Sequence, residues 1–114
     1  MRDSGNGMRE RLRSFVADHR EGWSHGHWES LLHGLREGGF DTAQPEQIGL
    51  ELERERVRMV LEDTRIRGLG PKRREAVAER FGSLWRLEHA SVDELTELSE
   101  LPRGVAEQLH AVLH

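Results

Sequence analysis

Residues 64–74 read Thr-Arg-Ile-Arg-Gly-Leu-Gly-Pro-Lys-Arg-Arg, and this stretch predicts a tight turn followed by a helix. Pro71 suits the first turn of a helix, where a missing N–H loses no hydrogen bond. Gly68 and Gly70 permit positive φ and place no Cβ in front of the backbone. The stretch contains five bases and no acid, so it concentrates positive charge at the turn.

The same apolar pattern returns 32 residues later, which indicates an internal repeat. A helix, a five-residue hairpin and a second helix occur twice, joined by a connector at residues 83–90. One copy cannot bury its own apolar face, whereas two copies packed about a pseudo-two-fold axis can. We expect a core of mid-sized aliphatic residues and two aromatics, Phe81 and Trp85. The matched apolar pairs are Ile66 with Leu98, Leu69 with Leu101, Val77 with Leu109, and Phe81 with Leu113.

Helical periodicity dominates the rest of the chain, and convincing alternating strand patterns are absent. We expect helices over about residues 8–19, 25–37 and 45–64, the second of them capped by Ser24. The prediction is therefore an all-α chain. Its parts are a flexible tail at residues 1–7, an N-terminal helical subdomain at residues 8–44 and a tandem hairpin module at residues 45–114.

Glu and Arg recur three residues apart along the expected third helix. Such spacing usually forms ion pairs on a solvated helix face, so these side chains are predicted to be exposed. The pairs are Glu51–Arg54, Glu53–Arg56 and Glu55–Arg58.

Composition limits the class of protein. The 114 residues carry a formal net charge of −4 and contain no cysteine. Disulfides and thiolate metal sites are therefore excluded, and a reducing cytoplasm is the expected location. No run approaches the ~20 apolar residues that a membrane span needs. The net charge argues against a nucleic-acid binder, but phosphate attraction acts over only about 8–10 Å, so the local basic stretch matters more.

Three segments taken in order resemble a known family. They are residues 66–74, then Phe-Gly-Ser-Leu at residues 81–84, then Ala-Ser-Val-Asp-Glu-Leu at residues 90–95. Together they are similar to the tandem helix-hairpin-helix domain at the C-terminus of the UvrC family of excinucleases. The resemblance covers about residues 50–114. It does not extend to residues 1–45, and no segment resembles the nuclease parts of such proteins.

The resemblance implies binding to the DNA phosphate backbone across the minor groove, without base recognition. Backbone N–H groups at the start of the helix and the surrounding bases then contact phosphate, while Ile66 and Leu69 anchor the turn. In the family such hairpins often hold a monovalent cation on their carbonyls; no other cofactor is expected. The competing interpretation is an ordinary helix–helix turn with solvated bases. The expected DNA-binding residues are Arg67, Gly68, Leu69, Gly70, Lys72, Arg73 and Arg74.

The second hairpin departs from the family pattern. Glu100 and Pro102 stand where the two glycines are usual, and residues 91–101 carry four acids and no base. A carboxylate faces phosphate unfavourably, and proline removes a donor. The second hairpin is therefore predicted to be structural, although Arg103 and Gly104 keep a role in DNA binding open.

The histidines of the N-terminal third do not have the spacing of a helical metal site. His25 and His27 are two residues apart, and His33 follows six residues later, whereas a helical zinc pair favours a spacing of four. We expect surface or helix-capping histidines and no metal. Trp23 and Trp28 flank the expected cap and are predicted to pack. The N-terminal helices could extend the core, mediate self-association or dock a protein partner.

The sequence thus favours a non-enzymatic, non-sequence-specific DNA-binding protein, an accessory in DNA repair or recombination. Duplex or branched DNA is the expected partner. The alternative is a protein–protein interaction module on a helix-hairpin-helix scaffold that has lost DNA binding. No group of acids and bases is recognisable as a nuclease site.

Overall fold

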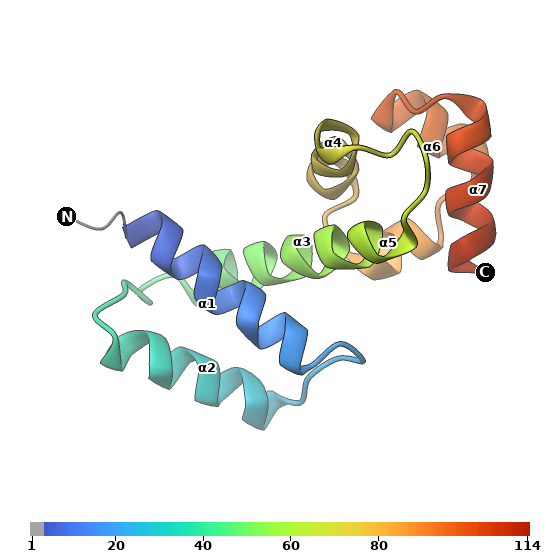
Figure 1. The fold of residues 1–114 in the computed structure, drawn as a ribbon. Helices are drawn as coiled ribbons and strands as arrows, with labels where there is room; N and C mark the ends of the chain where they lie inside the picture. The colour runs from blue at the N-terminus through green and yellow to red at the C-terminus, as the bar shows by residue number, and fades with distance from the viewer. Residues whose placement is uncertain (1–3) are drawn as a thin grey trace. The chain divides into compact units, whose positions relative to one another are not determined.

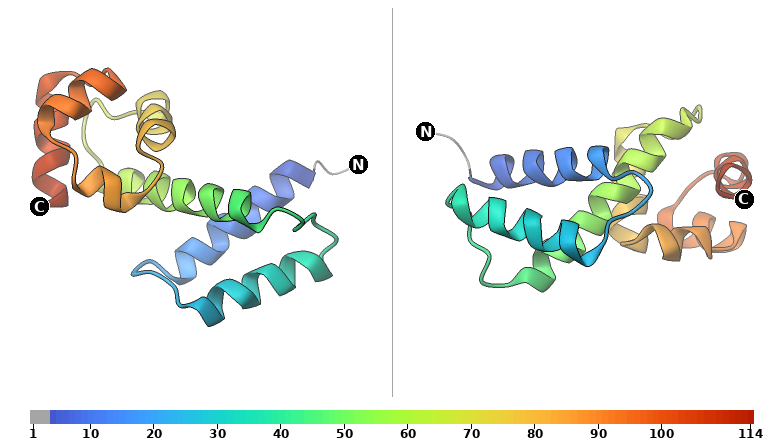
Figure 2. Two further views of the ribbon diagram at one scale, coloured as in Figure 1. Left: turned by 180° about the vertical axis from the view of Figure 1, so that it is seen from behind. Right: turned by 90° about the horizontal axis from the view of Figure 1, so that it is seen from below.

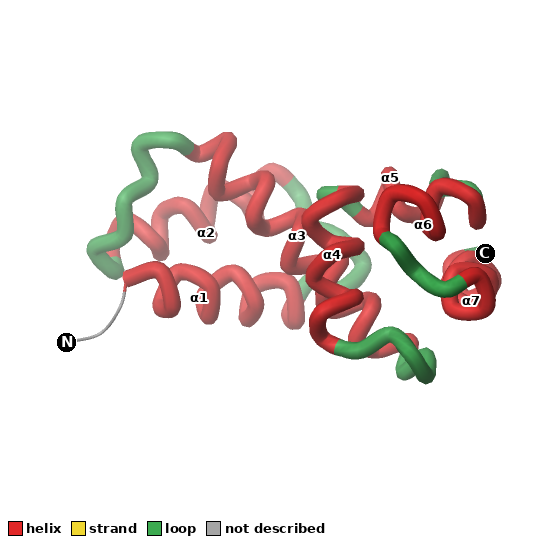
Figure 3. The backbone as a smooth tube through the Cα atoms, turned by 90° about the horizontal axis from the view of Figure 1, so that it is seen from above, coloured by secondary structure: helices red, strands yellow, loops and turns green. Residues whose placement is uncertain are grey.

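The computed structural model describes residues 4–114, apart from the side chains of residues 4–6, 98 and 99. The described part contains seven α-helices and no strand (Figures 1 and 3), which confirms the all-α prediction. The helices are α1 (Ser4–Asp18), α2 (His25–Glu37), α3 (Pro45–Thr64), α4 (Pro71–Phe81), α5 (Leu84–Glu88), α6 (Val92–Ser99) and α7 (Arg103–Leu113).

Two compact units divide the chain between Glu55 and Arg56, within α3. The first half of α3 belongs to the N-terminal unit and the second half to the C-terminal unit. The sequence analysis places its boundary earlier, at the loop before α3. Helix α1 begins at Ser4, inside the predicted tail, and residues 1–3 of that tail lie outside the described residues.

In the N-terminal unit, α1 and α2 run side by side in opposite directions (Figures 1 and 2). Ser24 caps α2 as predicted. Its hydroxyl accepts from the His27 N–H at 3.2 Å, and its own N–H donates to His27 Nδ1 at 3.2 Å. His27 is therefore a helix-capping histidine. The buried apolar side chains of this unit are Leu12, Val16, Leu32, Leu35, Ile48 and Leu52.

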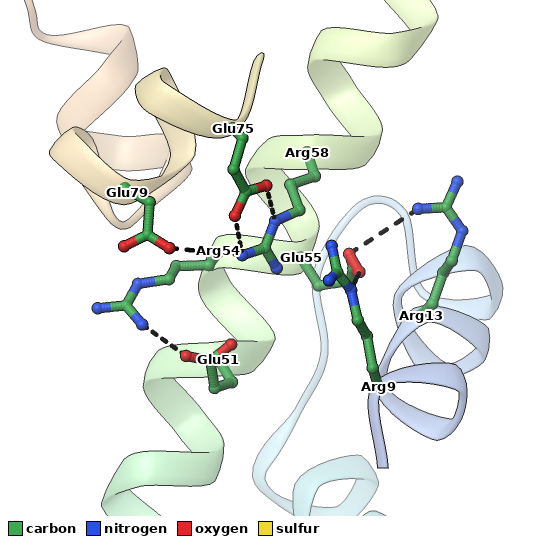
Figure 4. Close-up of polar contacts among 8 residues, drawn as sticks. All are labelled: Arg9, Arg13, Glu51, Arg54, Glu55, Arg58, Glu75 and Glu79. Atoms are coloured by element: carbon green, nitrogen blue, oxygen red, sulfur yellow. Dashed lines mark hydrogen bonds and ion pairs between the residues drawn. The ribbon is translucent and has the colours of Figure 1, made fainter. Parts of the chain in front are cut away.

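Helix α3 is not the uniformly solvated helix that its Glu–Arg spacing predicts. Glu51 and Arg54 do form the expected ion pair. Glu55 and Arg58, in contrast, are buried and have partners on other helices. Glu55 lies 3.6 Å from Arg9 Nε and 3.8 Å from Arg13 Nη1, both on α1 (Figure 4). The interpretation of Glu55–Arg58 as a surface pair was wrong, because i,i+3 spacing does not reveal which face of a helix is covered.

In the C-terminal unit the 32-residue repeat is present in the structure. Helices α4 and α7 each have 11 residues and start 32 positions apart. Their first backbone bonds correspond too: Arg74 N–H donates to Gly70 O at 2.9 Å, and Ala106 N–H donates to Pro102 O at 3.0 Å. Helix α6 packs against both helices. The core they share consists of Val57, Leu61, Leu69, Val77, Ala78, Phe81, Leu87, Ala90, Leu95, Leu101, Val105, Ala106 and Leu109.

Local signals fix the helix ends of this unit. Gly82 ends α4 in the left-handed conformation at φ 74°, and Ser83 caps α5. Ser91 and Glu94 form the predicted capping box at the start of α6. Trp85 is the exception to the expected core, since 66% of its surface is exposed. None of the helices described between residues 4 and 114 is long and apolar enough to span a membrane.

Candidate nucleic-acid interface

The first hairpin is the turn between α3 and α4, residues 65–70 (Figure 3). Arg65 leaves α3 in the left-handed region at φ 52°, and Gly68 follows at φ 92°. The Leu69 N–H donates to Ile66 O at 3.1 Å and closes the turn. Leu69 is buried and Ile66 packs against the same core, so both anchor the hairpin as predicted.

Gly68 is required by packing as well as by its backbone conformation. A Cβ at this position would lie 2.9 Å from Val105 Cγ2 on α7. That distance is too short for two carbon atoms, and the positive φ is unfavourable for any L side chain. The first hairpin is thus pressed against a helix of the second repeat.

Gly70 differs from Gly68 in both respects. It is the N-cap of α4 in an extended conformation that any residue adopts, with φ −78° and ψ −178°. A Cβ here would have no atom within 4 Å, so the space around Gly70 is open. The glycine therefore leaves the entrance to the α4 N-terminus unobstructed.

The start of α4 can donate hydrogen bonds into that open space. Lys72 and Arg73 stand in the first turn, where helix geometry offers no carbonyl partner for the N–H group. The positive end of the helix dipole adds to their attraction for an anion. The residues are placed as an anion-binding helix terminus requires.

Two of the predicted DNA-binding bases are fixed to the hairpin itself. Arg73 Nη1 donates to Gly68 O at 2.7 Å, and Arg74 Nη1 donates to Leu69 O at 3.0 Å. Arg67 and Lys72 are exposed, and neither side chain has an ion-pair partner among the described residues. Hence two guanidinium groups hold the turn while two further cations extend from it.

The acids of α4 are engaged elsewhere. Arg58, on α3 and nearly buried, donates to both carboxylate oxygens of Glu75 at 2.8 and 2.9 Å (Figure 4). Glu79 lies 4.0 Å from the same guanidinium. This bidentate pair neutralises carboxylates that would otherwise lower the positive potential of α4. Sequence reasoning missed Arg58, because its partner is 17 residues away.

The hairpin carbonyls do not fit a bound monovalent cation. The oxygens of Gly68 and Leu69 already accept hydrogen bonds from Arg73 and Arg74, both positively charged. A metal ion on these oxygens would have to approach two guanidinium groups. The chain therefore supplies from its own side chains the positive charge that a cation supplies at related hairpins.

The second hairpin has the same backbone form in acidic surroundings. Glu100 takes the left-handed conformation at φ 55°, where the first hairpin has Gly68. Arg103 Nη1 donates to Asp93 Oδ1 at 2.9 Å and lies 3.7 Å from Glu107. The hydrogen bond to Asp93 and the charge of that carboxylate raise the pKa of Arg103 above its ordinary value. The base of this hairpin is thus held by acids.

The histidines of α2 have local partners. His25 lies 3.2 Å from Glu29, and His33 lies 3.5 Å from Glu37. Across the described residues no group of three or more side chains is arranged to hold a metal ion. Trp23 packs edge-on against Phe15 of α1, at a ring-centroid distance of 5.4 Å.

Part of the chain is similar to curated repair proteins. It is 46% identical over 54 residues to UvrABC system protein C of Pseudomonas paraeruginosa, covering 47% of this chain and 9% of that protein. It is 45% identical over 47 residues to the Dechloromonas aromatica protein of the same name, covering 41% and 8%. The Methanothermobacter thermautotrophicus protein is 49% identical over 45 residues, covering 40% and 8%.

The matches confirm a partial resemblance to the C-terminal region of the UvrC excinucleases. The chain spans about a tenth of the length of these relatives. No family model matches the chain. No solved structure matches it either.

The two glycines of the first hairpin predict different effects of alanine. Gly68→Ala introduces the Val105 collision and an unfavourable φ, and is expected to lower the free energy of unfolding by about 1–3 kcal/mol. Gly70→Ala adds a methyl group in open space and is expected to change it by less than about 1 kcal/mol. Urea unfolding followed by circular dichroism measures both. Equal losses would contradict the assignment of Gly68 as the packing residue.

The guanidinium contacts predict a hairpin that does not depend on the monovalent cation. The unfolding midpoint is expected to be the same in potassium, sodium and tetramethylammonium chloride at equal ionic strength. Arg74→Ala frees the Leu69 carbonyl and is expected to lower the midpoint in all three salts. A wild-type midpoint that rises only with potassium would show that the carbonyls bind a metal ion.

Proposed function

We propose that this chain is a non-enzymatic DNA-binding protein that grips the phosphate backbone through its first hairpin. One observation carries the proposal. The open space at Gly70 lies before the first turn of α4, among bases and away from the paired acids of that helix. A phosphate entering there meets N–H groups, a helix dipole and fixed positive charge together.

Each element of the hairpin has a separate role in this mechanism. The N–H groups of Lys72 and Arg73 hydrogen-bond the phosphate oxygens. The guanidinium groups of Arg73 and Arg74 keep the turn in shape and hold charge near it. Arg67 and Lys72, which are exposed, attract the neighbouring phosphates. Leu69 is buried and acts as an anchor, without contacting DNA.

The proposed binding does not read sequence. Contacts to phosphate position a protein on DNA but carry no base information. Neutralised phosphates release counterions, so the affinity falls steeply as salt increases. We propose duplex or branched DNA as the partner.

Binding through a single hairpin is expected to be weak. The charge of Arg103 is held by Asp93 and Glu107, and Glu100 is exposed at the second turn. A second phosphate grip at this place meets carboxylates. The partial similarity to UvrABC system protein C supports an accessory role in DNA repair or recombination, with another surface or protein adding affinity.

The second candidate is a protein-docking module. The acid-rich second hairpin and the net charge of −4 favour it. The N-terminal helices would then serve self-association or a protein partner. A docking module has no need of bases gathered around an open helix terminus, so the charge at the first hairpin favours DNA.

Removing the exposed bases of the first hairpin tests the proposal. Arg67→Ala/Lys72→Ala is expected to weaken binding of labelled DNA by more than tenfold and to make the salt dependence shallower by about one unit of slope per lost contact. Lys72→Ala/Arg73→Ala is expected to abolish binding, because it also frees the Gly68 carbonyl. Fluorescence anisotropy with duplex, single-stranded and branched DNA at two salt concentrations gives these values.

Arg103→Ala is the matched control, since it removes an arginine from the equivalent hairpin. It is expected to leave the affinity within about twofold, because Asp93 and Glu107 already neutralise this side chain. If Arg103→Ala weakened binding as much as Lys72→Ala/Arg73→Ala, the assignment of the hairpins would be reversed. If the folded wild type bound no DNA at low salt, the docking module would take its place.

A further inference from the structure

The connector between the repeats exposes an aromatic side chain. Trp85, on α5, has 66% of its surface in solvent although it belongs to a unit with a well-filled core. One face of its indole is stacked on His89, with ring centroids 4.0 Å apart and planes inclined by 22°. His89 Nδ1–H donates to Trp85 O at 2.8 Å, which fixes the imidazole in this position. Because so much of the indole is exposed, its other face is open to a ligand.

A hollow of about 400 Å³ adjoins the indole. Phe81, Trp85 and His89 give it aromatic walls, and Arg80 and Arg86 bring positive charge from the end of α4 and from α5. Glu94 also lines it, but one of its carboxylate oxygens accepts from the Ser91 N–H at 3.0 Å and is held at the start of α6. The hollow thus combines a stacking surface with bases.

We propose that this hollow, at Trp85 and Arg86, binds an unpaired nucleobase of single-stranded DNA. A base continues the stack on the open face of the indole, and Arg86 and Arg80 attract the flanking phosphates. Stacking of this kind accepts any base, because every base has a π face. Flat aromatic groups alone would suit many ligands, but the two arginines select an anionic chain.

The site is separate from the first hairpin. The hairpin precedes α4, and the connector with α5 follows it (Figure 3). The 11 residues of α4 make a helix about 16 Å long, which is about the length of five stacked nucleotides. A single DNA molecule can therefore reach both places. The proposal adds a single-strand contact to the backbone grip and does not require that grip to exist.

Nuclear magnetic resonance of the full chain, titrated with a short oligothymidylate, tests the proposal. The indole N–H signals of the tryptophans are resolved one by one, and Trp85→Phe assigns the one of interest. The Trp85 signal is expected to shift, whereas those of Trp23 and Trp28 stay in place. The same shift is expected in the Arg67→Ala/Lys72→Ala variant, so failure of the hairpin assignment is distinguished from failure of this one.

Affinity for the labelled oligothymidylate gives the second readout. Trp85→Ala and Arg86→Ala are each expected to weaken binding about tenfold. Leu50→Ala, which removes another exposed large apolar side chain, is the control and is expected to have no effect. A Trp85 signal that the oligonucleotide leaves unmoved would overturn the proposal. So would a signal that moves only with protein concentration, which would assign Trp85 to self-association.

Discussion

The contact of Gly68 with Val105 joins the two repeats of the C-terminal unit, and the first hairpin keeps its shape because of it. A tight turn with two exposed bases has little apolar surface of its own. Leu69 and Ile66 pack on one side of it, and α7 of the second repeat presses on the other. The backbone of the hairpin is thereby fixed before any ligand arrives, so binding a phosphate costs little ordering of the chain.

The two repeats share a core but not a surface. Leu69 and Leu101 are equally buried, whereas glycine stands at one turn and Glu100 at the other, both with positive φ. A non-glycine residue in this region costs about 1–2 kcal/mol. The second hairpin tolerates that cost because the core it closes is shared with the first. Its surface is accordingly free to become acidic, which leaves one hairpin suited to phosphate.

Local signals made most of this architecture predictable. Pro71, Gly82 and the Ser91–Glu94 capping box act within a few residues of themselves, so the sequence alone indicates where the helices begin and end. The repeat was visible for the same reason. Contacts over longer separations were not. The burial of Glu55 and Arg58, and the exposure of Trp85, depend on which helix covers which face, and residue spacing does not contain that information.

The central claim is that one hairpin of the pair meets the DNA backbone. The most direct measurement is the change in backbone amide signals when a short duplex is added to the isotope-labelled chain at low salt. The account predicts that the changes concentrate at residues 66–74, with Gly70, Lys72 and Arg73 the largest, and that residues 100–104 change little. Changes centred on residues 100–104, or spread over the N-terminal helices with none at the first hairpin, would contradict it.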